Sequence, residues 1–296
     1  MLFNVDWYRN RSSSQLVNYT VPPTTGFPSI LRNLPAVVGN EGWEFVLNTV
    51  NVKGTAFSWS TALNVTVPKN KLVSFPDFVN SSYNNTYVIG QPLSIHKVYR
   101  YLGVDTHTGL YTFADKEGKP TSAPTPIVDQ TSLVNTDRRW YGGLSNTFRY
   151  KGLQLIVLLQ YVHQKNYDIA VYGQPPGAVG NFVTKVMSRW QKEGDKTTIQ
   201  RFTQNTSTDA YTAGMYVIDS ERAFADGNFL RVKNVSLSYD LGKGIAGRLH
   251  SKALRVYVNA QNLLTVTPYS GADPETGGSG FLPPMRTIVG GIQCTF

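Results

Sequence analysis

Apolar and polar residues alternate with a period of two along much of this chain, which is the pattern of β-strands with one apolar and one polar face. The clearest stretch is 57–67, where Phe57, Trp59, Leu63, Val65 and Val67 share one face and Ser58, Ser60, Asn64 and Thr66 share the other. Seven further stretches show strand character: 2–9, 40–52, 139–150, 153–161, 229–241, 254–267 and 286–296. We therefore predict an all-β fold with about eight principal antiparallel strands.

The last three stretches are each about the length of a tilted strand that crosses a bilayer, roughly 9–11 residues. In 254–267 the apolar face carries Leu254, Val256, Val258, Ala260, Leu264 and Val266 and is interrupted by Asn262. A strand with lipid outside and water inside has this pattern, and so does a soluble sandwich strand with a core on one side. The alternation alone leaves both interpretations open.

The connections between the strands are expected to alternate in length. Short turns follow residues 52, 150 and 241, and long connections follow residues 9, 67, 161 and 267. Outer-membrane barrels join their strands by short periplasmic turns and longer extracellular loops, in the same alternation. Four aromatic residues flank the first turn and would form an interfacial girdle or a cross-strand cluster of a soluble hairpin: Trp43, Phe45, Phe57 and Trp59. The alternation favours a transmembrane β-barrel segment with long extracellular loops.

The amino-acid composition agrees with β structure and argues against several classes of function. Charged residues make up only 16% of the chain, and 26 glycines and 16 prolines suit strands and turns. The net charge of +9 comes from scattered Lys and Arg, so no basic block indicates nucleic-acid binding. The single cysteine, Cys294, excludes a disulfide framework within the chain. No apolar run reaches the roughly 18 residues of a transmembrane helix. Because strand-like sequence begins at Leu2, we expect no signal peptide in this sequence.

No arrangement of residues predicts a catalytic, cofactor or metal site. The histidines have no paired spacing: His96, His107, His163 and His250. The sequence has no Gly-x-Ser-x-Gly nucleophile motif, and no pair of carboxylates stands out. Asp105, Asp115 and Glu117 could suggest a calcium loop, but their spacing does not fit the EF-hand pattern, and two small turns around a strand at 110–113 are favoured. We therefore expect a protein that is not an enzyme and needs no metal or cofactor.

Several segments resemble one known family. The strongest are FLRVKNVSLSY at 229–239, LRVYVNAQNLLT at 254–265 and YSGADPE at 269–275, which are similar to the closing strands and loop of SusC/RagA-type TonB-dependent outer-membrane transporters. Shorter segments match in the same order: TGF at 25–27, NEGWE at 40–44, GVD at 103–105 and TG at 108–109. The resemblance covers nearly the whole chain and is most specific from residue 226 onward.

The resemblance implies a fold and a role. These transporters are 22-stranded barrels with an amino-terminal plug, so residues 1–296 would form the carboxy-terminal part of such a barrel, about eight strands, without the plug or the TonB box. They import glycans or peptides across the outer membrane of Gram-negative bacteria of the Bacteroidetes type. A SusD-like lipoprotein at the extracellular loops and the TonB complex would be partners, the latter through the missing amino-terminal region.

The resemblance also suggests individual roles. Four polar residues on lumen-facing sides of the strands are candidates for the substrate path: Arg139, Tyr141, Asn259 and Gln261. They could equally hydrate the barrel wall or contact a plug. Phe296 is placed to serve as the terminal signal for barrel assembly. The alternative function is a secreted, soluble β-sandwich that binds carbohydrate, which would be a monomer without detergent, whereas a barrel segment would require detergent or lipid.

Overall fold

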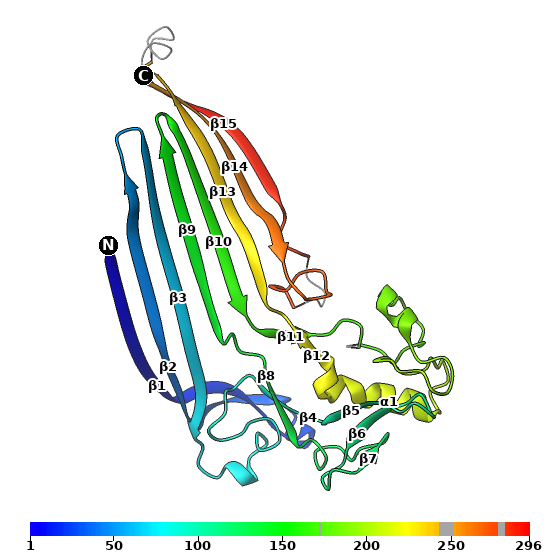
Figure 1. Cartoon of the computed structure of the whole chain (residues 1–296). Coiled ribbons are helices and arrows are strands. Elements are labelled where there is room, and N and C mark those ends of the chain that lie inside the picture. The colour runs from blue at the N-terminus through cyan, green and yellow to red at the C-terminus, as the bar shows by residue number, and fades with distance from the viewer. Residues whose placement is uncertain (172, 243–250, 278–281) are drawn as a thin grey trace.

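The computed structural model describes residues 1–171, 173–242, 251–277 and 282–296. Eight antiparallel strands lie side by side in one curved sheet, each paired with its neighbours in chain order (Figure 1). The strands are β1 (Leu2–Thr20), β2 (Ser29–Lys53), β3 (Phe57–Ser74), β9 (Trp140–Tyr150), β10 (Leu153–His163), β13 (Phe229–Leu241), β14 (Ala253–Val266) and β15 (Thr287–Thr295). The eight strands and their antiparallel order confirm the sequence prediction. A closed barrel of about 22 strands remains a prediction, because β1 and β15 form two edges of this sheet.

The long connections gather at one end of the sheet, and the turns after β2 and β9 lie at the other (Figure 1). The loop between β3 and β9 contains η2 (Phe78–Asn80), β4 (Ile95–Val98), β5 (Tyr101–Val104), β6 (Tyr111–Ala114), β7 (Pro120–Thr121) and β8 (Ser132–Asn135). The loop between β10 and β13 contains β11 (Lys165–Tyr167), η3 (Thr184–Ser188), α1 (Asp209–Tyr216), η4 (Val217–Asp219), η5 (Glu221–Ala223) and β12 (Phe224–Asp226). In the described residues, no helix is both long enough and apolar enough to span a membrane.

Two local predictions are wrong. The connection after residue 9 is not long, because β1 and β2 continue to pair as far as Thr20 and Ser29, so only residues 21–28 join them. A register shift beside Ser14, which has a left-handed φ of 52°, lets the strands continue beyond the regular alternation. The sequence also predicts a short helix at 181–191, where the structure has only the 3₁₀ turn η3. The α-helix begins after Thr208, whose side chain accepts a hydrogen bond from the Tyr211 N–H.

One face of the sheet is apolar and is bordered by aromatic residues at both ends. Strand pairing aligns successive outward-facing rows: Trp7, Trp43 and Val67; Val5, Phe45 and Val65; Phe3, Leu47, Leu63 and Leu144. Trp140, stacked on Tyr161 with centroids 4.4 Å apart, borders the loop end of β9, and Tyr150 borders its turn end. The ten residue steps from Trp140 to Tyr150 span roughly 33 Å along the strand, or about 25 Å across a bilayer if the strand is tilted by about 40°.

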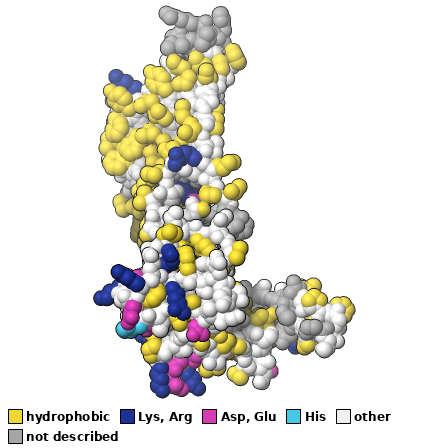
Figure 2. Space-filling model, turned by 90° about the vertical axis from the view of Figure 1, so that its right-hand side faces the viewer, with side chains coloured by type: hydrophobic (Ala, Val, Ile, Leu, Met, Phe, Trp, Pro, Cys, Tyr) yellow, Lys and Arg dark blue, Asp and Glu magenta, His cyan; other side chains and the backbone are white. Residues whose placement is uncertain are grey.

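This spacing matches the apolar band of an outer-membrane strand. Figure 2 shows hydrophobic side chains gathered along one side of the sheet, with many of the charged side chains in this view near the long loops. The girdle expected around the first turn is therefore divided between two borders. Phe57 and Trp59 lie at the turn end of the sheet. Trp43 lies ten residues before Lys53, the last residue of β2, and is therefore at the loop end. It is half-exposed and lies opposite Trp7.

The polar residues on the apolar face form hydrogen bonds with one another. The amide oxygen of Asn146 accepts hydrogen bonds from the Trp59 indole at 2.9 Å and the Thr61 hydroxyl at 2.7 Å. Asn51 donates to Thr61 at 2.7 Å and accepts from Thr49 at 2.7 Å. Because unsatisfied polar groups are costly in an apolar environment, this chain of contacts makes the polar side chains compatible with lipid.

The two largest loops pack against each other and form a small domain beyond the sheet, which we call the loop cap (residues 95–121 and 168–224). Its core contains buried residues from both loops: Tyr99, Tyr111, Phe113, Val171, Ala213 and Val217. The Tyr99 N–H donates to Asp219 O at 2.9 Å, and the Arg201 N–H donates to Gly109 O at 2.9 Å. Gln200 is completely buried, accepting from the Tyr111 N–H at 3.2 Å and donating to Ala210 O at 2.5 Å. The long loops are therefore ordered by each other.

Candidate functional site

A polar cavity of about 540 Å³ lies where the inner face of the sheet meets the long loops. Its sheet wall includes Tyr8, Asn40, Asn70 and Tyr141, and the Asn70 amide donates to the Asn40 amide oxygen at 2.6 Å. The opposite wall comes from the loops and includes Arg138, Gln164, Asn166, Glu275 and Thr276. Amides, hydroxyls and charges of both signs therefore line the cavity, a set that suits a hydrated polar ligand.

The loop between β14 and β15 closes one side of this cavity. Gln164 and Asn166 each donate a side-chain N–H to Pro274 O at 2.6 Å. The Tyr269 hydroxyl donates to Tyr167 O at 2.9 Å, and the Thr267 hydroxyl donates to the backbone beside β13. The start of the β10–β13 loop thus fixes the position of the β14–β15 loop.

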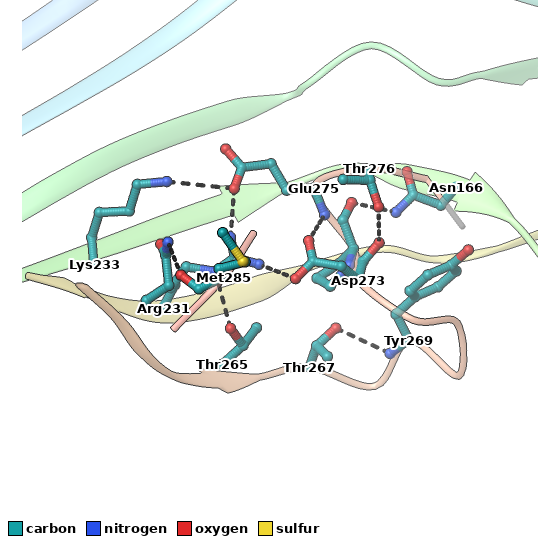
Figure 3. Close-up of polar contacts among 12 residues, drawn as sticks. Asn166, Arg231, Lys233, Thr265, Thr267, Tyr269, Asp273, Glu275, Thr276 and Met285 are labelled. Carbon is teal, nitrogen blue, oxygen red and sulfur yellow. Dashed lines mark hydrogen bonds and ion pairs between the residues drawn. The ribbon is translucent and has the colours of Figure 1, made fainter. Parts of the chain in front are cut away.

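A buried charge cluster holds the same loop to the sheet (Figure 3). Arg231 is only 1% exposed, and each of its guanidinium nitrogens donates to a different residue. The Nε donates to Thr265 at 3.0 Å, one terminal nitrogen to Glu275 at 2.5 Å and the other to Asp273 at 2.5 Å. Lys233 lies 3.5 Å from the same Glu275 carboxylate, so two cations face two anions. Because a buried charge is costly unless it is paired, this balance makes full burial of Arg231 possible.

A β-bulge in β13 directs Arg231 toward the loops. The register against both β10 and β14 shifts between Val232 and Asn234, which leaves Lys233 as the extra residue. The extra residue lets Leu230 lie on the apolar face while Leu237 lies there too, and Arg231 turns inward. The sequence analysis assigned no role to Arg231, Asp273 or Glu275.

The four substrate-path candidates are not all brought together. Tyr141 lines the cavity, and Arg139 lines a neighbouring cavity of about 230 Å³ with His163 and Asp226. Asn259 and Gln261 lie on β14, opposite Ser236 and Asn234, and line neither of these two cavities. A role in a substrate path remains a prediction for all four.

Phe296 follows β15 at the end of the sheet that carries the short turns, and it is 76% exposed (Figure 1). This position is compatible with a terminal assembly signal, which remains a prediction.

The carboxylates considered for calcium are used in turns instead. Asp105 accepts hydrogen bonds from the His107 and Thr108 N–H groups, and Asp115 accepts from those of Glu117 and Lys119. They flank β6, close to the predicted strand at 110–113. Within the described residues, no three His, Cys, Asp or Glu side chains gather as metal ligands. His250 lies outside the described residues.

Asp168 joins distant parts of the 168–224 segment of the loop cap. Its carboxylate lies 2.5 Å from Arg222 and 3.5 Å from Lys185, and accepts the Ala170 N–H at 2.9 Å. Burial by itself would raise the pKa of Asp168, but these hydrogen bonds and positive charges lower the pKa below its usual value. A lowered pKa means that this carboxylate stabilises the fold at neutral pH, and that the contribution is lost as the pH falls below about 4.

Asp168→Asn is therefore expected to destabilise the loop cap by about 1–3 kcal/mol at pH 7. The stability of the variant should also fall less than that of the unsubstituted protein when the pH is lowered from 7 to 3. Amide hydrogen exchange of residues 168–224 at pH 7 and pH 3 would measure both effects. The exposed Asp195 is the matched control, and Asp195→Asn should change only the local turn. Equal acid sensitivity of Asp168→Asn and the unsubstituted protein would contradict the assignment.

Two curated relatives from Formosa agariphila match almost the whole chain. TonB-dependent receptor P3 is 26% identical over 98% of the chain, and TonB-dependent receptor P26 is 25% identical over 99%. The chain is homologous to TonB-dependent receptors. It spans about a third of the length of these relatives, 32% of each. No protein-family profile matches the chain.

Solved structures agree with this relationship to TonB-dependent receptors. The RagAB peptide transporter matches with a TM-score of 0.79 at 22% identity, covering 99% of this chain and 33% of that one. The RagAB peptide importer in its 'closed-closed' state matches with the same TM-score at 25% identity and the same coverage. The resemblance to SusC/RagA-type transporters inferred from sequence is confirmed. These similar proteins are named receptors, transporters and importers.

Proposed function

We propose that this chain forms part of the barrel wall of an outer-membrane TonB-dependent nutrient importer. The main support for the proposal is that the two faces of one sheet have different characters. An apolar face bordered by aromatic residues fits a bilayer, and a polar cavity occupies the other face at the loop end. In this arrangement the short turns and Phe296 face the periplasm, and the loop cap faces the exterior. The role is transport and not catalysis.

The cavity is the proposed entrance of the substrate path. Its amides and hydroxyls suit the many hydrogen-bonding groups of an oligosaccharide or a peptide, and Tyr8 and Tyr141 add ring surfaces. Glu275 belongs both to the cavity wall and to the Arg231 cluster, so the cluster would keep one charged group of the path in place. The RagAB proteins are named for peptides. Both classes of nutrient remain within the proposal.

Import would also require the other domains of the protein and its partners. The plug and the TonB box would lie in the two thirds of the relatives' length that this chain does not match, and the TonB complex would supply energy through them. A SusD-like lipoprotein would dock on the loop cap, where apolar side chains stand exposed on the β10–β13 loop, including Val179 at 88% and Met187 at 66%.

The soluble β-sandwich is the less favoured alternative. A sandwich covers the apolar face of one sheet with a second sheet. Among the described residues, the three additional sheets are small, and all lie within the loops at one end of the eight-stranded sheet. Heat-modifiable migration in detergent distinguishes the two architectures, because a folded barrel migrates differently before and after boiling. An unchanged migration would count against the importer.

Tyr141→Ala is expected to weaken substrate uptake by about tenfold, because the cavity loses an aromatic ring and a hydroxyl. The protein that contains this sequence would be expressed with its lipoprotein partner, and binding of candidate oligosaccharides and peptides would be measured alongside uptake. Tyr150→Ala is the control, since Tyr150 lies at the turn end, outside the cavity. Equal uptake by the Tyr141→Ala variant and the unsubstituted protein would remove Tyr141 from the proposed path.

A further inference from the structure

Charged residues replace apolar ones immediately beyond the aromatic border at the loop end of the sheet. The border row contains Trp7, Trp43 and Val67, directly opposite one another on β1, β2 and β3. The next outward-facing row is Arg9, Glu41 and Lys69, and the row after it is Arg11, Gly39 and Lys71. We call the five charged residues of these two rows the cationic rim. By register it occupies the same face as the apolar band, because outward positions recur every second residue. Lys69 also belongs to the wall of the polar cavity.

The cationic rim has more positive charge than its own carboxylate can neutralise. Glu41 lies 3.9 Å from the Arg9 guanidinium and 3.8 Å from the Lys71 ammonium, distances of loose ion pairs. The rim thus contains four cations and one carboxylate, and two of the cations lie within 4.0 Å of that carboxylate. The side chains of Arg9 and Lys71 remain 45% and 34% exposed, so both can accept a further anionic partner.

The four cations lie on β1 and β3, on either side of β2, and β2 contributes only Glu41 to the rim. Gly39 places no side chain of its own between Arg11 and Lys71, and the side chains of Val73 and Lys71 lie beside it. The Arg231 cluster, by contrast, is balanced and buried. The surplus positive charge of the cationic rim is therefore complementary to an external anion. Such an anion would lie beside β1 and β3, just beyond the border tryptophans.

We propose that the cationic rim binds the phosphate groups of an anionic lipid in the outer leaflet, with the acyl chains of that lipid lying against the apolar band. This inference rests on the proposed function, since the loop end faces outward only in an outer-membrane importer. The border tryptophans mark the level at which lipid head groups begin, and the rim lies one and two rows beyond them. Arg and Lys at this level attract anionic head groups, and Arg can hold phosphate through two hydrogen bonds.

The test is lipid binding by the protein that contains this sequence, purified in detergent and examined by native mass spectrometry. Three probes are compared: lipid A carrying its phosphates, dephosphorylated lipid A and inorganic phosphate. Phosphorylated lipid A should bind at least about tenfold more tightly than the dephosphorylated form, with about fivefold lost for each rim cation replaced. The combined variant Arg9→Gln, Arg11→Gln, Lys69→Gln and Lys71→Gln should lose the preference. Inorganic phosphate at millimolar concentration should not compete.

Two further variants make the result specific. A variant with four exposed loop lysines replaced, Lys116→Gln, Lys119→Gln, Lys192→Gln and Lys196→Gln, has the same change in net charge and should keep the preference. Glu41→Gln removes the one carboxylate and should bind phosphorylated lipid A at least as tightly as the unsubstituted protein.

Heat-modifiable migration separates this inference from the proposed function. A combined rim variant that migrates as a folded barrel and keeps the phosphate preference would overturn the lipid site alone. Equal competition by inorganic phosphate, or weaker lipid binding by the Glu41→Gln variant, would also overturn it. If the unsubstituted protein showed no heat-modifiable form, the importer itself would be contradicted.

Discussion

Replacing Arg231 with methionine is expected to destabilise the protein by about 3–5 kcal/mol, because it leaves two partly buried carboxylates without their main counter-charge. Asp273 and Glu275 both accept hydrogen bonds from this guanidinium, and their loop closes the polar cavity. The loop should separate from β13, so that proteases cut it before the strands unfold. Urea unfolding in lipid vesicles would measure the loss, and limited proteolysis would locate it.

The pair formed by Arg255 and Asp240 is a matched control on the same strands. Its distance is also 2.5 Å, but the two side chains are 42% and 55% exposed. Arg255→Met should therefore cost no more than about 1 kcal/mol. Adding Asp273→Asn and Glu275→Gln to Arg231→Met should recover part of the stability, because the uncompensated charges disappear. Equal losses for the Arg231 and Arg255 variants would show that burial is not what makes Arg231 important.

The second large effect is expected at the centre of the apolar band. Leu144 lies near the midpoint of β9 between Trp140 and Tyr150, in an outward row with Leu63 and Leu159. Leu144→Arg should cost about 2–4 kcal/mol, the penalty of a cation at the bilayer midplane. Its neighbour Ser145 faces the other way, and Ser145→Arg should cost at most about 1 kcal/mol because its side chain reaches water.

Both Arg variants would be unfolded by urea in phospholipid vesicles and checked for heat-modifiable migration. The two substitutions add the same side chain at adjacent positions of one strand, so strand propensity and net charge cancel in the comparison. The large cost should appear only at Leu144. The same penalty at both positions, or a larger one at Ser145, would contradict the assignment of the lipid face.

The principal strands could be predicted because each has one apolar face and one polar face, and apolar and polar residues therefore alternate along its sequence. The segment 229–241 was predicted to the residue as β13, and 139–150 and 153–161 match β9 and β10 within two residues. The extension of β1 and β2 was missed because its pairing continues past the apolar face, through Ser, Gln and Asn residues. The helix α1 was missed because it has only eight residues and is stabilised by packing against the β3–β9 loop.

The cavity could be anticipated only in part. Tyr141 was recognisable as an inward polar residue of a regular strand, and the structure places it in the cavity wall. Arg231 was not, since its importance comes from carboxylates 42 and 44 positions away in the chain. The available signal was two charges in an otherwise apolar strand, close to a loop with two carboxylates. Pairing across such a distance depends on the register, which a single bulge changed.

The burial of Arg231 has a consequence for behaviour in concentrated salt. Dissolved ions screen exposed charges over about 3 Å at 1 M ionic strength, but they act much less on pairs removed from solvent. The loop closing the cavity should therefore keep its position across a wide range of salinity, since its main anchor is 1% exposed. Attraction at the cationic rim should weaken over the same range. Salinity would then alter the association of this protein with its membrane while leaving the entrance of its substrate path unchanged.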